Sequence, residues 1–287
     1  MTKMNQKFEP LFSLLIANYN NGRYLFDCFK SIFNQTYTNW EVVFVDDGST
    51  DNSMNLIQSL SESDSRIKYF KNNTNHGCGF TKNRCIALSN GKICGFLDPE
   101  DTITKDAIEI MVRNHLENPE YSLIFSSYYE CNSHLIPIKT KRPILTEDKL
   151  ASQLIIKNIS HFATFKRQAY DKTQGINTKL KRAVDQDLYL KLEETGQVLY
   201  IDSPLYYYRL HEGGISTFSN RYKAEYWEYL VKHQACLRRG IDTEVYFAKV
   251  IEEKEKTYIK STQFKIGSII LYPYHALKKL FKSKHNL

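Results

Sequence analysis

Apolar runs alternate with segments of helical periodicity between residues 12 and 97. Continuous apolar runs are typical of strands that are buried on both faces, and helices between such strands return the chain to the same edge of a sheet. The alternation therefore predicts an α/β fold with a doubly wound, mixed but mostly parallel sheet flanked by helices. The expected strands lie in 12–20, 41–45, 67–70 and 93–97, and the expected helices in 21–35, 49–60 and 79–91.

Polar residues follow three of these apolar runs, at the point where each expected strand ends. They form ANYN at 17–20, DDGS at 46–49 and DPED at 98–101. Ligands of doubly wound sheets bind beyond the carboxyl ends of the strands. Adjacent aspartates also resist burial unless water, a ligand or backbone donors hold them. The sequence therefore predicts a binding site at this edge of the sheet.

Charge is distributed unevenly along the 287 residues. Seven of the 39 basic residues are lysines between Lys256 and the C-terminus, a stretch without acidic residues, and the other 32 balance the 32 acidic residues. A nucleic-acid-binding body would carry its own basic face, so we expect no nucleic-acid partner. Attraction to an anionic surface is instead expected at the C-terminal end.

The six cysteines include no C-x-x-C pair, and the N-terminal segment MTKMNQKFEP is polar and unlike a secretory leader. Metal sites and disulfide frameworks usually show paired cysteine spacings, and leaders carry an apolar stretch. We therefore expect free thiols in a reducing cytoplasm, rather than zinc ligands or disulfides.

Four sequence motifs carry a resemblance to a known family. They are SLLIANYNNGRYLFDCFKSIFNQTYTNWEVVFVDDGSTDNS, GFLDPEDTIT, AVDQDLYLKL and YYYRLHEGGIS. In this order and spacing they resemble the family-two glycosyltransferases with the A-type nucleotide-sugar-binding fold (GT-A), over residues 10–217. The resemblance implies the inverting transfer of a sugar from a nucleotide diphosphate to a hydroxyl acceptor, assisted by manganese or magnesium. We accordingly expect a GT-A domain at 8–217 and, at 218–287, a helical extension with a basic amphipathic tail.

The nucleotide is expected at the first two strand ends. Asp46 and Asp47 can accept a hydrogen bond from a ring N–H, while Tyr19, with Ala17 beside it, offers a stacking face. Uracil and thymine carry such an N–H and cytosine does not. In the enzymes that this chain resembles, this part of the chain holds uracil, so the resemblance implies a UDP-sugar donor. Lys82 matches a position where relatives often carry arginine, and its charge can meet the diphosphate. The alternative interpretation of DDGS is a capped turn that begins a helix.

The acidic segment LDPED is the expected metal site. Magnesium and manganese prefer oxygen ligands and keep positions open for substrate phosphates. In the Asp-x-Asp pattern of the family Asp98 fits, and is expected to contact both donor and metal, whereas Glu100 replaces the second aspartate. Asp101 is an alternative ligand, and the Tyr-Arg-x-His pattern implies that His211 joins the metal shell. The competing interpretations are an acidic helix cap and a structural histidine.

Asp185 is the expected catalytic base. If residues 184–194 form a helix, Leu188 shares one face with Leu192, and Asp185 lies near the helix start, facing the cleft. One carboxylate suffices for direct displacement, because it takes the acceptor proton as the oxygen attacks the anomeric carbon. Val184 stands where the family often has glutamate. Asp187 is interpreted as a surface carboxylate, and both aspartates could instead serve only to balance the helix dipole.

The C-terminal stretch contains an uncharged run of 12 residues from Ile266 to Leu277. That is too short to span a bilayer, which needs about 20 apolar residues. With its aromatic residues and lysine-rich end, the stretch fits an interfacial segment attracted to anionic lipid. The alternative is a basic helix packed on the body. We expect a cytoplasmic protein bound peripherally to the inner face of the cell membrane.

Three functions compete at this point. The first is transfer of a sugar to a glycan or lipid-linked acceptor in surface polysaccharide or glycolipid assembly. The second is a polyprenyl-phosphate glycosyltransferase, whose acceptor is a phosphate; the long region after residue 120 disfavours it. The third is a catalytically inactive nucleotide-binding module, which the departures at Glu100 and Val184 favour. A donor-hydrolysis assay with metal distinguishes the third from the others.

Overall fold

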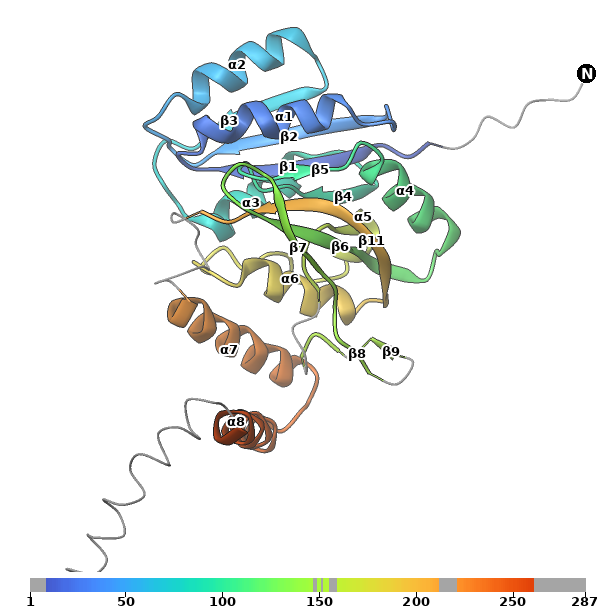
Figure 1. Ribbon diagram of the computed structural model, residues 1–287, viewed down its shortest axis with the longest axis vertical. Helices are drawn as coiled ribbons and strands as arrows, with labels where there is room; N and C mark the ends of the chain where they lie inside the picture. The colour runs from blue at the N-terminus through green and yellow to red at the C-terminus, as the bar shows by residue number, and fades with distance from the viewer. Residues whose placement is uncertain (1–8, 147–148, 151, 155–158, 212–220, 261–287) are drawn as a thin grey trace, which may run out of the picture. The chain divides into compact units, whose positions relative to one another are not determined.

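The computed structural model describes residues 9–146, 149–150, 152–154, 159–211 and 221–260 (Figure 1). The described residues form two compact units, divided after Ala235. The expected domain boundary between residues 217 and 218 lies outside the described residues, as does the tail from residue 261 onward. Within the described residues, we find no helix with the length and apolar character needed to cross a membrane.

The first unit is built on a nine-stranded mixed sheet (Figure 1). Its strands are β1 (Phe12–Asn18), β2 (Trp40–Asp46), β3 (Ile67–Lys71), β4 (Ile93–Phe96), β5 (Thr102–Ile103), β6 (Tyr121–Cys131), β7 (Pro137–Lys141), β10 (Ala163–Lys166) and β11 (Gln197–Arg209). They are ordered β3-β2-β1-β4-β10-β6-β11-β5, and β7 pairs with β6. The strands β1 to β4 run parallel, as the alternation predicts, whereas β10 is antiparallel to both neighbours. A small second sheet pairs β8 (Leu145–Thr146) with β9 (Lys149–Leu150).

The helices expected between residues 21 and 91 are present, and further helices follow them along the chain. In chain order the helices are η1 (Gly22–Tyr24), α1 (Leu25–Phe33), α2 (Ser53–Ser63), α3 (Cys78–Leu88), α4 (Ala107–Glu117), α5 (Arg167–Tyr170), α6 (Val184–Glu193), α7 (Arg221–Arg238) and α8 (Thr243–Lys260). The helix expected from residue 49 begins only at Ser53. The preceding turn is held by side chains, since Asn20 Oδ1 accepts the N–H of Thr50 at 2.8 Å and Asp51 Oδ1 accepts that of Ser53 at 3.1 Å.

The helix α1 shows how the sequence pattern becomes packing. Its buried residues Leu25, Cys28, Phe29 and Ile32 recur at a spacing of three or four, so they share one face. This face joins the core residues of β1 and β2, of which Phe44 lies 6.3 Å from Phe29 between ring centroids. Both strands are buried at almost every position, as expected for strands covered on both sides. The ends of these strands are thereby held at one edge.

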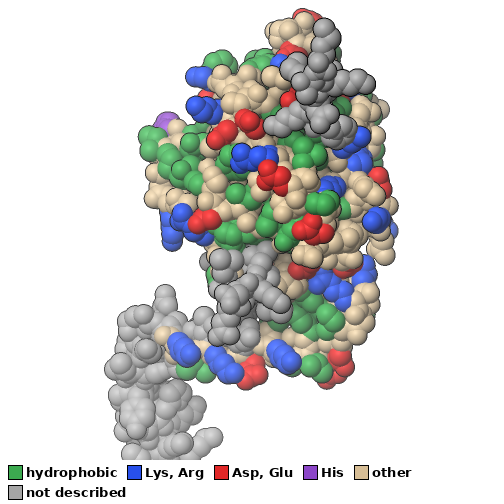
Figure 2. Space-filling model, turned by 90° about the vertical axis from the view of Figure 1, so that its right-hand side faces the viewer, with side chains coloured by type: hydrophobic (Ala, Val, Ile, Leu, Met, Phe, Trp, Pro, Cys, Tyr) green, Lys and Arg blue, Asp and Glu red, His purple; other side chains and the backbone are tan. Residues whose placement is uncertain are grey.

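The surface of the larger unit carries both signs of charge. On the face shown in Figure 2, lysine and arginine side chains are interspersed with aspartate and glutamate. This mixture agrees with the equal numbers of basic and acidic residues before Lys256. Of the seven lysines from Lys256 onward, Lys256 and Lys260 belong to α8, and the others lie outside the described residues.

A buried histidine in the core makes the stability of the fold depend on pH. His115 on α4 is 2% exposed, and its Nε2 lies 3.0 Å from Thr164 Oγ1. Burial, helped by the nearby charge of Lys166, lowers the pKa of His115 from 6.5 to about 3. The folded protein therefore keeps this imidazole neutral at pH values where the unfolded chain protonates it.

We expect His115 to cost the fold about 2 kcal/mol of unfolding free energy between pH 7 and pH 5. Between these pH values the unfolded chain binds a proton at His115 and the folded protein does not. The unfolding free energy is therefore unaffected by His115 above its ordinary pKa of 6.5, and it decreases as the pH falls below that value. Urea unfolding of wild type and His115→Gln at both pH values measures the effect, because the difference between the two proteins cancels the other titrating groups. An identical pH dependence of the two proteins would contradict it.

Candidate functional site

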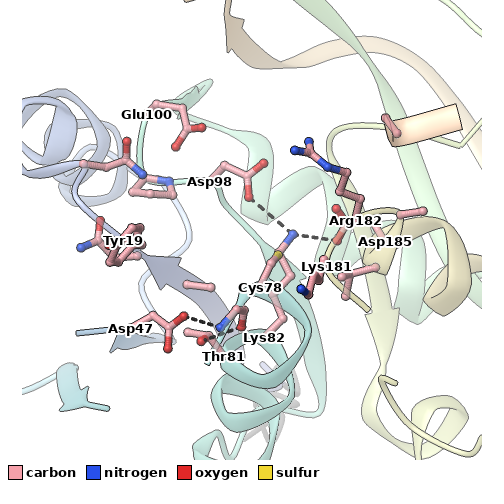
Figure 3. Close-up of a pocket in the computed structure, with 18 of the residues that line it drawn as sticks. Tyr19, Asp47, Cys78, Thr81, Lys82, Asp98, Glu100, Lys181, Arg182 and Asp185 are labelled. Atoms are coloured by element: carbon pink, nitrogen blue, oxygen red, sulfur yellow. Dashed lines mark hydrogen bonds and ion pairs between the residues drawn. The ribbon is translucent and has the colours of Figure 1, made fainter. Parts of the chain in front are cut away.

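A large open pocket of ≈1430 Å³ lies at the carboxyl ends of β1, β2 and β4. Each predicted site residue except Asp46 lines this pocket, and Figure 3 labels six of them. The predicted residues that line it are Ala17, Tyr19, Asp47, Lys82, Asp98, Glu100, Asp185 and His211. The polar residues that follow three strands therefore meet in one place. The start of α3, the loop before α6 and one side of α7 complete the wall.

The structure separates the two adjacent aspartates. Asp46 is the last residue of β2 and is fully buried. Its carboxylate accepts hydrogen bonds from Asn18 Nδ2 at 2.9 Å and from the Ser49 N–H at 2.8 Å. The prediction that Asp46 contacts the nucleotide is therefore revised, because its oxygens face the turn beneath the pocket instead of the pocket.

Asp47 lies one residue further and borders the pocket. Its Oδ1 accepts from Asn72 Nδ2 at 2.7 Å and from the His76 N–H at 2.9 Å, and its Oδ2 accepts from the Gly77 N–H at 2.7 Å. A carboxylate offers about four acceptor positions, so one remains for a ligand N–H. The neighbouring Gly48 has φ +76°, and a Cβ there would meet the backbone of residue 74 at 2.9 Å. Glycine is thus required for the close approach of this loop.

Lys82 lies between two carboxylates (Figure 3). Its Nζ is 2.7 Å from Asp185 Oδ1 and 3.5 Å from Asp98 Oδ1. Burial disfavours the charged ammonium, but the carboxylates of Asp185 and Asp98 together outweigh burial and raise the pKa of Lys82 well above its ordinary value. Burial likewise opposes ionisation of Asp98, yet Lys82 and then His161 lower the pKa of Asp98. These three side chains carry a net charge of −1 in the pocket.

In the acidic segment after β4, the carboxylates of Glu100 and Asp101 have different surroundings. Glu100 Oε1 lies 3.6 Å from His211 Nε2. Asp101 is fully buried, and it accepts hydrogen bonds from Tyr206 Oη at 2.8 Å and from the Arg209 N–H at 2.7 Å. Burial, followed by the charges of Glu100 and Asp98, raises the pKa of Asp101 well above its ordinary value. Asp101 therefore supports the loop, which favours Glu100 as the residue that faces a cation.

Arg209, from the Tyr-Arg-x-His pattern, fixes this segment in place. Its Nε donates to the carbonyl of Glu100 at 2.7 Å, and its terminal nitrogens donate to the carbonyl of Ser133 at 2.7 Å and to Asp27 Oδ2 at 2.8 Å. The guanidinium also lies 4.6 Å from the ring centroid of Tyr24. The arginine of the motif is thus a buried support, and it positions the neighbouring His211.

Asp185 lies in the first turn of α6, as expected. Ala183 precedes this helix with φ +54°, a left-handed conformation that is unfavourable for a residue with a Cβ. Such strained backbone is common at functional sites, and here it turns the chain at the pocket wall. The interpretation of Asp187 as a surface carboxylate is wrong, because Asp187 is buried and pairs with Lys191 at 2.6 Å.

Reasoning from the sequence missed His161. Its ring stacks on Tyr206 and Tyr208, with centroid distances of 4.7 and 5.1 Å, and it lines the pocket. Burial lowers the pKa of His161, although Asp98 and Asp185 act in the opposite direction. A neutral imidazole at this point can accept a proton. The segment NISHFATF contains no signal for the role, because the aromatic partners of His161 come from two other strands, β6 and β11.

The expected metal requires several donor side chains close to one another. Among the described residues, no group of three or more His, Cys, Asp or Glu side chains is arranged to hold an ion. The pair Glu100 and His211 still fits, because two ligands about 2.1 Å from one ion lie 3 to 4 Å apart. His211 Nδ1 is buried and has no hydrogen-bond partner within the described part of the chain. The residues present can therefore supply part of a metal shell.

Comparison with known proteins identifies the family. The model of the family "Glycosyl transferase family 2" matches residues 13–174, more than half of the chain. The chain belongs to glycosyl transferase family 2. A chondroitin synthase from Escherichia coli is 32% identical over 207 residues, which make up 71% of this chain and 30% of that protein. This chain therefore spans less than a third of the length of that relative.

Two solved structures of similar fold add to this comparison. TarS 1–349 from S. aureus, in complex with UDP-GlcNAc, matches with a TM-score of 0.63 at 18% identity, over 82% of this chain and 69% of that chain. The mannosyltransferase PcManGT from Pyrobaculum calidifontis, in complex with GDP-Man and Mn²⁺, matches with a TM-score of 0.55 at 13% identity, over 96% and 88%. The predicted family and its α/β GT-A fold are confirmed.

Proposed function

We propose that this chain is an inverting glycosyltransferase that moves a sugar from a UDP-sugar to a hydroxyl group of a glycan or lipid-linked acceptor. The observation that carries the proposal is one pocket with Tyr19 and Asp47 from the ends of β1 and β2 and with Asp185 from α6. Family membership supports sugar transfer. The similar fold of TarS, a structure with UDP-GlcNAc, supports UDP as the nucleotide. The relative named as a chondroitin synthase supports a role in polysaccharide assembly.

The proposed chemistry follows from the position of each group. Tyr19, which is 46% exposed, offers a face to the base, and Asp47 accepts the ring N–H. Asp185 takes the proton of the acceptor hydroxyl as its oxygen attacks the anomeric carbon from the side opposite the diphosphate. The bond between that carbon and the diphosphate breaks, so the product is inverted and the nucleotide diphosphate leaves.

The acceptor is proposed to enter along the side of the pocket formed by α7. Tyr226 and Trp227 line it there, and Tyr128 and Tyr208 line it from β6 and β11. Aromatic rings present large apolar faces at low entropic cost, with which the apolar face of a sugar ring can pack. This wall therefore suits the sugar rings of a glycan chain.

We also propose that the reaction depends on a divalent metal, manganese or magnesium, held by Asp98, Glu100 and His211. The proposal is supported by the 3.6 Å approach of Glu100 to His211 and by the fold shared with PcManGT, a structure with GDP-Man and Mn²⁺. When bound, the metal supplies positive charge that offsets the charge of the diphosphate.

The choice of nucleotide tests the function directly. We expect UDP and dTDP to raise the melting temperature more than CDP does, because only uracil and thymine offer Asp47 a ring N–H. A ligand at a hundredfold excess over its Kd stabilises a protein by about 2.7 kcal/mol, which thermal scans detect easily. Stabilisation by UDP without any release of UDP from a panel of UDP-sugars would favour the inactive module. No shift with any nucleotide would contradict the proposal.

Peripheral attachment to the inner face of the cell membrane is proposed on the charge of the tail. We expect the protein to bind vesicles with anionic lipid and to dissociate as salt rises, because salt screens the lysines. Deletion of residues 264–287 should abolish this binding. A full-length variant removes positive charge from the tail but keeps the length of the tail. In it, Lys278, Lys279, Lys282 and Lys284 are changed to glutamine. Sedimentation of the truncated protein with the same vesicles would contradict attachment through the tail.

A further inference from the structure

At the centre of the pocket, the ammonium of Lys82 is closer to one of its two carboxylate partners than to the other. Lys82 is 4% exposed, and its ammonium lies closer to Asp185 than to Asp98, at 2.7 against 3.5 Å. It also lies 4.8 Å from the ring centroid of Phe96. Asp185, the proposed base, is thus the nearer of the two partners of the Lys82 ammonium. This contact occupies one of the two carboxylate oxygens of Asp185.

The contact is set by two separate elements of the fold. Lys82 projects from the second turn of α3, and Asp185 from the first turn of α6, 103 residues further along the chain. The start of α3 is held by the hydrogen bonds of Asp47 to the loop at 76–77. The same aspartate is the proposed nucleotide contact. The helix that carries Lys82 is therefore tied to the nucleotide end of the pocket.

An ammonium has three donors on a flexible four-carbon chain, so Lys82 can exchange partners without movement of the backbone. The side chains of Asp185 and Asp98 are 34% and 30% exposed, so the pair faces solvent on the pocket side. A diphosphate brings at least two negative charges into this space. It competes with a single carboxylate for the same ammonium, and charge complementarity favours the diphosphate.

We propose that Lys82 is a positioning residue that holds Asp185 in the free enzyme and releases it when a diphosphate enters the pocket. Both oxygens of the base are then free of Lys82 only in the donor-bound enzyme, which favours an order in which the donor binds before the acceptor. This inference rests on the proposed function, because it takes the ligand to be a nucleotide diphosphate.

Labelling of Asp185 with a carbodiimide and an amine, read by peptide mass spectrometry, tests the inference in the full-length protein. Ligands usually protect the carboxylates of their pocket from such reagents. Here UDP with Mg²⁺ should increase the labelling of Asp185, on the order of fivefold, because a partly exposed ion pair is worth up to about 1 kcal/mol. Asp202 serves as the internal control, since it pairs with Arg142 at 2.8 Å outside the pocket lining.

Two variants separate release of the base from a merely structural role. In Lys82→Met, Asp185 should be labelled rapidly without UDP, and UDP should not increase the labelling further. Lys82→Arg keeps a cation at this point, so it should restore both the low initial labelling and the increase with UDP. If Lys82→Met does not fold, wild type and Lys82→Arg still decide the question.

Protection of Asp185 by UDP in wild type, or labelling that UDP does not change, would overturn the inference while leaving the proposed function intact. Equal initial labelling of wild type and Lys82→Met would overturn it as well. The thermal shift with UDP is measured on the same samples. Absence of that shift would contradict the proposed function itself, and the inference with it.

Discussion

Replacement of Asp185 by asparagine is expected to lower turnover by about a hundredfold or more, the range typical for loss of a general base. The amide keeps the shape of the side chain and its place in the first turn of α6, but it cannot take a proton from the acceptor. The release of UDP from a UDP-sugar in the presence of acceptor measures the effect. Asp171→Asn, the same change at an exposed carboxylate outside the pocket, is the matched control and should keep normal turnover.

Near-normal turnover of Asp185→Asn would contradict the assignment of the base. Asp187 could not then take over the role, because it is 1% exposed and pairs with Lys191 at 2.6 Å. His161 would become the candidate, since it lines the same pocket and burial lowers its pKa. A second substitution, His161→Gln, would decide between the two groups.

The fold was predictable where it depends on local patterns. The spacing of Leu25, Cys28, Phe29 and Ile32 is enough to indicate α1, and the apolar runs indicate β1 to β4. The position of β10 was not predictable, since it lies between β4 and β6 and is antiparallel to both. Its pairings join residues about 40 to 70 positions apart, and such contacts leave no periodic signal in the sequence.

The candidate site was predictable to the extent that it depends on strand ends. Asp47 and Asp98 line the pocket because each is among the first residues after a strand. Asp46 does not, because β2 extends through it, and a shift of one residue at a strand end turns a side chain to the other side. Strand bounds read from sequence are uncertain by more than one residue.

The environment of α6 required the tertiary structure. Asp185 and Asp187 are two residues apart and therefore point in different directions on a helix. The sequence shows which leucines share a face, but α6 is buried on most sides, including at Lys191. Only the packed structure shows that Asp187 faces inward to a lysine and that Asp185 meets Lys82 from another helix.

Removal of divalent cations is expected to weaken UDP binding by about tenfold to a hundredfold, which corresponds to about 1.4 to 2.8 kcal/mol of binding free energy. The carboxylates of Asp98 and Glu100 border the pocket and repel a diphosphate unless positive charge lies between them. Lys82 supplies one positive charge, but Asp185 and Asp98 both share it. Titration calorimetry with UDP in Mn²⁺, in Mg²⁺ and in excess chelator measures the effect.

Variants at the two proposed ligands show whether the cation acts at this place. Glu100→Gln and His211→Ala should each weaken UDP binding in Mn²⁺, because their contribution passes through the metal. In chelator His211→Ala should have little effect, and Glu100→Gln should strengthen UDP binding, because it removes a charge that repels the diphosphate. His134→Ala changes an exposed histidine outside the pocket lining and should behave as wild type. Equal UDP affinity in Mn²⁺ and in excess chelator would contradict the metal assignment. Lys82 would then be the group that balances the diphosphate, and Lys82→Met should weaken UDP binding equally in both solutions.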